Sequence, residues 1–173
     1  MPFLDYWLVP NVTVRIADSD DAEAIADIYN YEVENTTATF DLVRRTIDAQ
    51  REWLAARTGA FSAIVAHDAE HGVIGFAALS TYRDRAGYRT TVENSVYVRR
   101  DHQRRGVGRL LLGSLVELAR DSGFHTIIAR IDSQSHGSLA LHRSLGFTEI
   151  GVEREIGRKF GRWLDSVIMQ KML

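Results

Sequence analysis

A glycine-containing turn constrains the fold of this chain more than any other segment. The run Gln103-Arg104-Arg105-Gly106-Val107-Gly108 follows a strand-like stretch and precedes a long amphipathic one. A strand-to-helix turn of this kind leaves backbone N–H groups unpaired at the positive end of a helix dipole, where anions bind. Arg104 and Arg105 add positive charge there, which suits a phosphate or pyrophosphate. Taken alone, a Gly-x-Gly turn is as often purely structural, and this one is neither a Walker loop nor the three-glycine dinucleotide motif.

The apolar pattern around the turn predicts an α/β domain with a mixed central sheet. Residues 91–98 are rich in β-branched side chains, as in a strand, and residues 106–122 carry leucines at the spacing of one helix face. Hairpins and strand–helix–strand crossovers together give both antiparallel and parallel pairing. The predicted order is strand 13–17, helix from 22, helix 46–57, strands 61–67, 73–80 and 91–98, helix 106–122, strand 126–131, helix 136–145, and two strands between 147 and 171.

Length and composition predict one domain, residues 1–173, with residues 1–11 as a leader outside the core. The chain is 45% apolar and 25% charged, and its formal net charge of -2 gives no general attraction to nucleic acid or an anionic membrane. The absence of cysteine excludes disulfides, thiolate metal sites and a cysteine acyl-enzyme. The six histidines lack metal-ligand spacing, so we expect no metal site. Without a basic n-region or a long apolar run, we expect a cytoplasmic protein that does not enter a membrane.

Three motifs carry a resemblance to a known family. They are Val96-Tyr97-Val98, Gln103-x-x-Gly106-x-Gly108 and Leu141-His142-x-x-Leu145-Gly146-Phe147. Together with the predicted element order, they resemble the GNAT superfamily of acetyl-CoA-dependent N-acetyltransferases over residues 14–171. Within it, segments such as Thr91-Val92-Glu93-Asn94-Ser95 are similar to the phosphinothricin and methionine sulfoximine acetyltransferases. The resemblance implies the GNAT fold, a mixed sheet flanked by helices, and acetyl transfer to the α-amine of a small amino acid.

The resemblance also implies where acetyl-CoA binds. Its pyrophosphate is expected on the backbone amides of the glycine turn, where a Cβ at Gly106 or Gly108 would collide with the ligand. Its pantetheine arm is expected to pair with strand 96–98 like an added strand, although this segment is also predicted to be core. Ser135 stands where many relatives use asparagine to bind that arm. The expected cofactor-binding residues are Val96, Tyr97, Val98, Arg104, Arg105, Gly106, Val107, Gly108, Arg109, Ser135 and Ser138.

Acetyl transfer to an amine needs a base, a donor to the oxyanion and a proton for the departing thiolate. Glu93 interrupts an otherwise apolar strand and resembles the base proposed for the subgroup; the alternative is an outward-facing strand carboxylate. Glu34, predicted in the loop after the first helix, matches a family carboxylate that holds the ammonium or shares the base role; the alternative is a solvated helix-end charge. His142 stands where many relatives have a tyrosine near the thiol and can donate to the sulfur, whereas a lone helix histidine is otherwise structural. A backbone N–H of residues 96–98 is the expected oxyanion donor.

The acceptor implied by the resemblance carries a carboxylate and a tetrahedral, oxygen-bearing side chain, which arginine and backbone donors bind. Arg85, in a basic loop at residues 82–88, is predicted to bind the carboxylate; the alternative is a solvated loop. Lys159 and Trp163 match a late motif near the substrate entrance and dimer interface of the family. The expected substrate-binding residues are Phe40, Tyr82, Arg83, Arg85, Tyr88, Lys159 and Trp163.

Two other functions fit the same fold. One is acetyl transfer to a peptide N-terminus or a polyamine, which needs an open or acidic cleft and is disfavoured by the basic loop at 82–88. The other is a non-catalytic acetyl-CoA-binding module, which the presence of both Glu34 and Glu93 disfavours. The resemblance also implies a homodimer. The basic run at 99–105 has no interleaved aromatic residues and does not indicate nucleic-acid binding.

Overall fold

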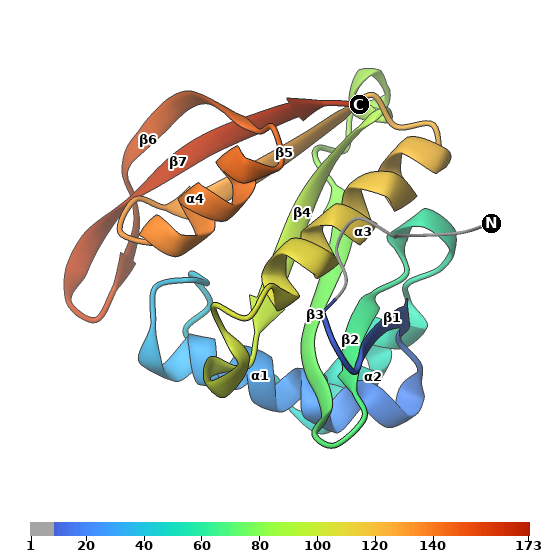
Figure 1. Cartoon of the computed structure of the whole chain (residues 1–173). Coiled ribbons are helices and arrows are strands. Elements are labelled where there is room, and N and C mark those ends of the chain that lie inside the picture. Colours follow the sequence, from blue (N-terminus) through green and yellow to red (C-terminus); the bar gives the residue numbers. More distant parts are fainter. Residues whose placement is uncertain (1–8) are drawn as a thin grey trace.

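Seven strands of the described chain form one mixed sheet in the order β1-β2-β3-β4-β5-β7-β6 (Figure 1). The structure is a computed structural model that describes residues 9–173, so residues 1–8 of the predicted leader lie outside the described part. Val9, also assigned to the leader, packs against the core beside Gly106. Only β4 and β5 pair in parallel. The strands are β1 (Val12–Ile16), β2 (Ile64–Asp68), β3 (Gly72–Thr81), β4 (Thr91–Val98), β5 (Thr126–Asp132), β6 (Thr148–Lys159) and β7 (Arg162–Met172).

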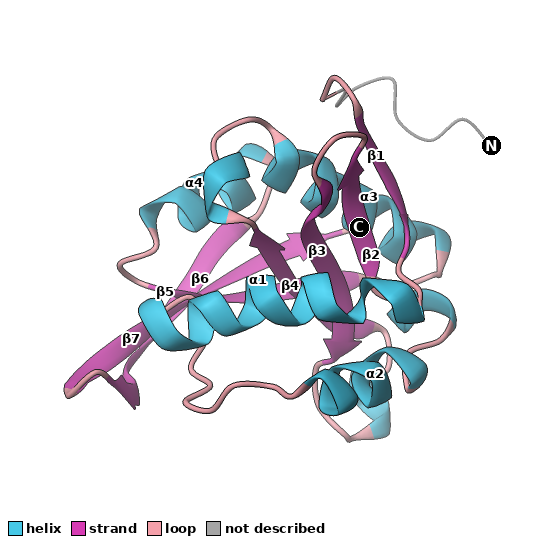
Figure 2. Ribbon diagram, turned by 90° about the horizontal axis from the view of Figure 1, so that it is seen from below, coloured by secondary structure: helices cyan, strands magenta, loops and turns pink. Residues whose placement is uncertain are grey.

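Helices cover both faces of this sheet (Figures 1 and 2). α1 and α2 pack on one face against Val65 and Phe76, whereas α3 and α4 pack on the other. The larger core lies under α3, whose Leu111 and Leu115 are fully buried against strand residues such as Ile127. The α-helices of the described chain are α1 (Ala22–Asn35), α2 (Ile47–Ala55), α3 (Val107–Asp121) and α4 (His136–Ser144).

The predicted α/β class and the predicted order of elements are confirmed, with ends displaced by a few residues. Thr46 is not helical but is the N-cap of α2, because its hydroxyl accepts a backbone N–H of the first turn. The strand predicted from residue 61 begins at Ile64, because Gly59–Phe61 form a short 3-10 turn. Gly106 adopts a φ of 89° immediately before α3, a conformation that glycine reaches without steric cost.

The parallel pairing between β4 and β5 is short, and this shapes the rest of the molecule. The ladder covers only Thr91–Glu93 on β4, opposite Thr126–Ile128 on β5. Beyond Glu93 the two strands separate, while β4 continues to pair with β3 and β5 with β7. An opening lined by two strands therefore forms in the middle of the sheet.

The last two strands form a long hairpin that extends beyond the rest of the sheet (Figure 1). β6 pairs with β7 from Thr148 to Lys159, with register shifts at Glu149/Gly151 and Glu153/Gly157. Its surface carries large apolar side chains that are between 43% and 59% exposed in the single chain, namely Ile150, Val152, Ile156, Phe160 and Trp163.

Candidate active site

A cleft of about 1090 Å³ lies where β4 and β5 separate. Its walls come from β4, the glycine turn, β5, α4 and its preceding loop, the α1–α2 loop at residues 36–40, and β6. These segments are far apart in the sequence, yet they bring many of the predicted site residues together. Those lining the cleft are Phe40, Glu93, Val96, Tyr97, Val98, Arg104, Gly106, Gly108, Arg109, Ser135, Ser138 and His142.

One wall of the cleft is an unpaired strand edge. The hydrogen bond from Arg99 N to Ile74 O, at 2.8 Å, fixes which β4 residues point their backbone groups at β3. Because these groups alternate along an antiparallel pair, Ser95 and Tyr97 bond to β3, whereas Val96 and Val98 present theirs to the opening. No strand of the described chain pairs with this edge beyond Glu93. An extended ligand can therefore bind here as an added strand.

The glycine turn closes one end of the cleft and offers backbone donors. The first bond of the α3 ladder runs from Leu110 N to Gly106 O, so the N–H groups of Val107 and Gly108 precede the ladder. The N-cap residue is Gly106, which has no side chain to cap these groups. Arg104 also has a positive φ, 59°, and its side chain reaches the cleft. This arrangement fits a phosphate, as predicted from the sequence.

Two of the predicted turn residues have different surroundings. Arg105 is exposed and does not line the cleft, and the Val107 side chain is 1% exposed in the core, so Val107 can contribute only its backbone. A Cβ at Gly108 would lie 3.2 Å from Leu141 and 3.7 Å from Val98, so this glycine allows α3, α4 and β4 to approach closely.

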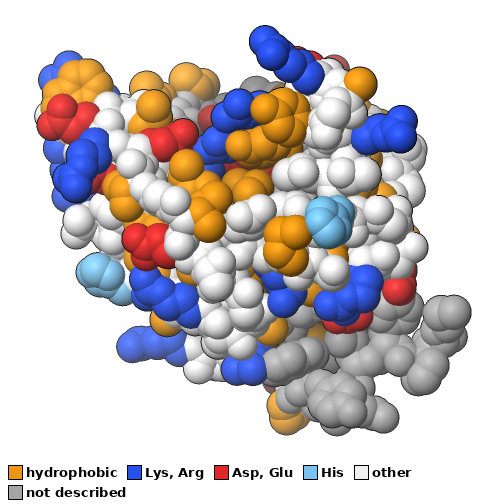
Figure 3. Space-filling model, turned by 90° about the horizontal axis from the view of Figure 1, so that it is seen from above, with side chains coloured by type: hydrophobic (Ala, Val, Ile, Leu, Met, Phe, Trp, Pro, Cys, Tyr) orange, Lys and Arg blue, Asp and Glu red, His pale blue; other side chains and the backbone are white. Residues whose placement is uncertain are grey.

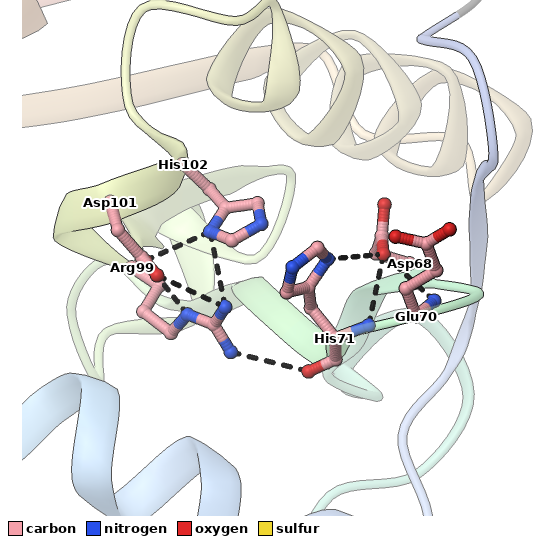
Figure 4. A network of polar contacts seen from close by, with 6 residues as sticks. All are labelled: Asp68, Glu70, His71, Arg99, Asp101 and His102. Atoms are coloured by element: carbon pink, nitrogen blue, oxygen red, sulfur yellow. Dashed lines mark hydrogen bonds and ion pairs between the residues drawn. The ribbon is translucent and has the colours of Figure 1, made fainter.

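A polar network braces the segment that leads into this turn (Figure 4). Arg99 makes a bidentate contact with Asp101 and donates to the carbonyl of His71, in the β2–β3 turn. His102 is buried, donates a 2.8 Å hydrogen bond from Nδ1 to the Asp101 carboxylate, and packs edge-on against His71 with ring centroids 4.8 Å apart. On the far side, a bond to His71 lowers the pKa of Asp68 to about 2. The start of the turn is thereby fixed to the sheet.

A chain of three charged side chains crosses the cleft where the two strands separate. Glu93 Oε2 lies 2.7 Å from Arg130 Nη1, and Arg130 Nε lies 3.3 Å from Glu153 Oε2. The three come from β4, β5 and β6, and each side chain is about 30% exposed. Burial raises the pKa of Glu93 above its ordinary value, an effect that the charge of Arg130 opposes. A partly buried carboxylate of this kind is a better proton acceptor than a free one.

His142 is buried beside the cleft with both ring nitrogens engaged. Nδ1 lies 2.8 Å from the carbonyl oxygen of Ser138 and must carry the hydrogen, because a carbonyl only accepts. Nε2 then accepts from the side-chain amide of Asn94, at 3.0 Å. Burial lowers the pKa of His142, which keeps the ring neutral. In this state the imidazole has no N–H directed into the cleft.

Comparison with known proteins agrees with this geometry. The model of the acetyltransferase (GNAT) domain matches residues 14–168. The chain belongs to the GNAT family of acetyltransferases. It is 43% identical over 164 residues to the L-amino acid N-acyltransferase MnaT of Escherichia coli, with 94% of both chains covered. It is 41% identical over 164 residues to the L-methionine sulfoximine/L-methionine sulfone acetyltransferase of Salmonella typhimurium, covering 94% of this chain and 95% of that one.

A solved structure extends the likeness to three dimensions. The phosphinothricin acetyltransferase of Sinorhizobium meliloti in complex with acetyl-CoA has a TM-score of 0.90 and 36% identity to this chain, covering 94% of this chain and 89% of that one. The GNAT fold and acetyl-CoA-dependent acetyl transfer predicted for this chain are therefore confirmed.

Glu34 of this GNAT enzyme lies apart from the cleft. It belongs to the last turn of α1 rather than to a following loop, and its exposed carboxylate pairs with Arg44 at 3.1 Å. Glu32, two residues earlier, faces the cleft instead and is buried. It pairs with Arg100 at 2.5 Å, and this pair separates the cleft from a second cavity of about 540 Å³ beside α1.

The α1–α2 loop closes the other end of the cleft and is held in place at Thr37, Thr39 and Phe40. Thr37 hydrogen-bonds to the buried Asp132 at the end of β5. Lys159 does not line the cleft; it is buried beneath the loop, where Nζ donates to the carbonyl of Thr39 at 2.8 Å. Phe40 packs on Gly157, where a Cβ would lie 2.5 Å from the ring. Lys159 therefore supports this end of the cleft by holding the loop in place.

The other predicted substrate residues do not line the cleft. Tyr82 and Tyr88 pack edge-on with centroids 5.5 Å apart, and Arg83 lies over both rings. Arg85 is exposed at the start of a 3-10 turn, and Trp163 is 59% exposed on the hairpin. The loop approaches the site through Tyr82, whose ring lies 5.6 Å from the Arg130 guanidinium.

Several lining residues were not predicted from the sequence, namely Glu32, Thr37, Asn94, Arg130, Asp132 and Glu153. One signal was present: Arg130 interrupts an apolar strand just as Glu93 does. Among residues 9–173, no three His, Asp or Glu side chains gather as a metal site would require. None of the helices in that range has the length and apolar composition needed to cross a membrane.

Proposed function

We propose that this enzyme acetylates the α-amine of a small amino acid, by direct transfer in a ternary complex with acetyl-CoA. The observation that carries the proposal is Glu93, a partly buried carboxylate at the point where the unpaired edge of β4 begins. The relatives named for methionine sulfoximine, methionine sulfone and phosphinothricin support an amino acid of this kind as the acceptor.

The residues of the cleft fit acetyl-CoA. The N–H groups of Val107 and Gly108, with the Arg104 side chain, are placed to bind its pyrophosphate, and the outward backbone groups of Val96 and Val98 to bind its pantetheine arm. When bound, acetyl-CoA supplies an activated thioester. A backbone N–H of the same strand edge then serves as donor to the developing oxyanion.

Glu93 acts as the base in this proposal. An amino-acid ammonium must lose a proton before its nitrogen can attack, and a carboxylate of raised pKa takes that proton more readily. Glu34 does not share this role, because its exposed carboxylate pairs with Arg44 and does not line the cleft.

The departing thiol needs little acid assistance, since thiols ionise near pH 8.5. His142 therefore acts first by holding Asn94 in the wall of the cleft. Donation from His142 to the sulfur requires that Nε2 gain a proton and that the Asn94 amide turn, because that nitrogen now accepts from Asn94.

The proposal is tested by thiol release from acetyl-CoA with methionine sulfone, methionine sulfoximine, phosphinothricin, common amino acids, a polyamine and a short peptide. We expect turnover of the amino acids, and a fall in kcat of about 10²- to 10⁴-fold in Glu93→Gln with unchanged acetyl-CoA affinity. Glu34→Gln is expected to retain activity, since its carboxylate faces solvent.

Two results would contradict this proposal. Preference for the peptide or polyamine would assign a different acceptor. Tight acetyl-CoA binding without turnover of any acceptor would indicate a binding module. Glu117→Gln, which removes an exposed partner of Arg120 on α3, is the matched control for loss of a surface carboxylate.

The proposal includes a homodimer that uses the β6–β7 hairpin, whose exposed apolar side chains would be covered by a second copy. On the face shown in Figure 3, apolar side chains lie among basic and acidic ones of the described residues, without a broad field of one charge. A cytoplasmic location stays a prediction, and the resemblance to phosphinothricin and methionine sulfoximine acetyltransferases also implies a role in resistance to such amino-acid analogues.

A further inference from the structure

Arg130 is the positively charged member of the chain of charges in the cleft. It rises from β5 into the opening, next to Glu93 on β4 and Glu153 on β6. The ring of Tyr82 lies 5.6 Å from its guanidinium carbon and limits its movement on one side. The guanidinium is therefore held in the cleft, next to the proposed base Glu93, by residues of three separate segments.

The guanidinium of Arg130 has hydrogen-bond donors that no described residue uses. Arginine carries five N–H groups, and in the described chain Arg130 uses Nη1 toward Glu93 and Nε toward Glu153. Nη2 donates to none of the described residues, although the side chain is only 28% exposed. A partly buried arginine with unused donors in a cleft is suited to bind an anion from solution.

We propose that Arg130 binds the α-carboxylate of the acceptor and so selects amino acids over other amines. This inference rests on the proposed function of the cleft. In an α-amino acid, the ammonium and the carboxylate are separated by a single carbon. Glu93 Oε2 and Arg130 Nη1 are 2.7 Å apart. The carboxylate of Glu93 can therefore face the ammonium of the amino acid while the guanidinium of Arg130 faces its carboxylate. The amine is placed at the base by the same contact that binds the carboxylate.

Glu153 binds Arg130 at Nε, and the carboxylate of the acceptor would take its place. Its bond to Arg130 Nε is long, 3.3 Å, compared with the 2.7 Å bond from Glu93. An incoming carboxylate competes with Glu153 for the guanidinium and repels it. Removing the charge of Glu153 should therefore favour acceptors that carry a carboxylate.

The other cations of the cleft are less suited to this role. Arg100 is paired with the buried Glu32, and Arg104 and Arg109 belong to the end of the cleft that fits pyrophosphate. Arg85, predicted for the carboxylate from the sequence, does not line the cleft. Arg130 is the lining arginine in contact with the proposed base.

The test compares methionine sulfone with its primary carboxamide, which keeps the amine and side chain but lacks the carboxylate charge. We expect the wild type to prefer the acid, and Arg130→Gln to lower kcat/KM for the acid, relative to the amide, by about 10- to 100-fold through KM. Any change in the basicity of Glu93 affects both acceptors and cancels in this ratio. Arg130→Lys should restore part of the preference, and Glu153→Gln should increase it.

An equal loss for acid and amide in Arg130→Gln would overturn the inference, as would an unchanged ratio in all three variants. If the wild type acetylates neither compound nor any other acceptor, the proposed function fails instead. Binding of the acid to the enzyme–CoA complex, measured by calorimetry, gives a readout that does not depend on turnover. Arg120→Gln, at the far end of α3, is the control for loss of a paired surface arginine.

Discussion

Two neighbours of opposite charge act on Glu93. Burial raises the pKa of its carboxyl, the charge of Arg130 lowers it, and the charge of Glu153 raises it. Since the base must be deprotonated, kcat/KM is expected to fall as the pH drops through this raised pKa, above the ordinary value of about 4.3. Arg130→Gln should move this acid limb to higher pH and Glu153→Gln to lower pH. A pH–rate profile for the three proteins checks the prediction, and shifts in the same direction would contradict it.

His142 links the site to stability. Burial lowers its pKa in the folded chain, so below the ordinary histidine value of about 6.5 the unfolded chain binds more protons. The stabilisation from a neutral His142 is thus present above that pH and is lost as the pH falls. We expect the melting temperature to drop between pH 7 and pH 5, and His142→Gln to flatten this dependence. The exposed His125, replaced by glutamine, is the control.

Single residues also show what the sequence can predict. Glu93 was predicted as a site residue because it interrupts an otherwise apolar strand, and it does line the cleft; the same reasoning applies to Arg130 on the neighbouring strand. Glu34 was predicted in the site and Glu32 was not; which of the two faces the cleft depends on the rotation of the last turn of α1 and on the partners Arg44 and Arg100. That information is tertiary and cannot be read from local pattern.

At the scale of elements, β4 has two edges with different tasks. Ser95 N–H bonds to β3, whereas Val96 N–H faces the opening. Proline removes an N–H, so Ser95→Pro leaves a carbonyl of β3 unpaired, at about 1–3 kcal/mol. Val96→Pro is expected to keep more of the stability but to weaken acetyl-CoA binding by about tenfold. Thermal melting and calorimetric titration of both variants check this, and equal cofactor binding by the two would contradict it.

The order of the elements followed from periodicity and turn residues, because each helix and strand carries its own pattern. The point at which β4 and β5 separate could not be predicted from periodicity and turn residues. Past Glu93 and Ile128 both strands mix polar and apolar residues, which does not mark the point of separation. The separation arises because β5 pairs with β7 along its whole length while β4 follows β3. The site depends on this difference in pairing between the two halves.

At the scale of the whole molecule, the β6–β7 hairpin predicts self-association. Phe160 and Trp163 are more than half exposed in the single chain, so replacing both by glutamate should change its folding stability little. We expect the wild type to sediment at twice the 19.5 kDa mass of the chain, and the double variant at that mass. A wild type that sediments as a monomer would contradict the proposed dimer.

The short ladder between β4 and β5 also has a mechanical meaning. In the described chain, only three paired positions join β4 to β5, so the two halves of the sheet can move relative to each other at this boundary. A pantetheine arm bound along the open edge of β4 would add backbone hydrogen bonds there and would reduce local opening. Acetyl-CoA should therefore slow hydrogen exchange at residues 94–98 more than in β2 or β3, and the enzyme would reach its full stiffness only when loaded.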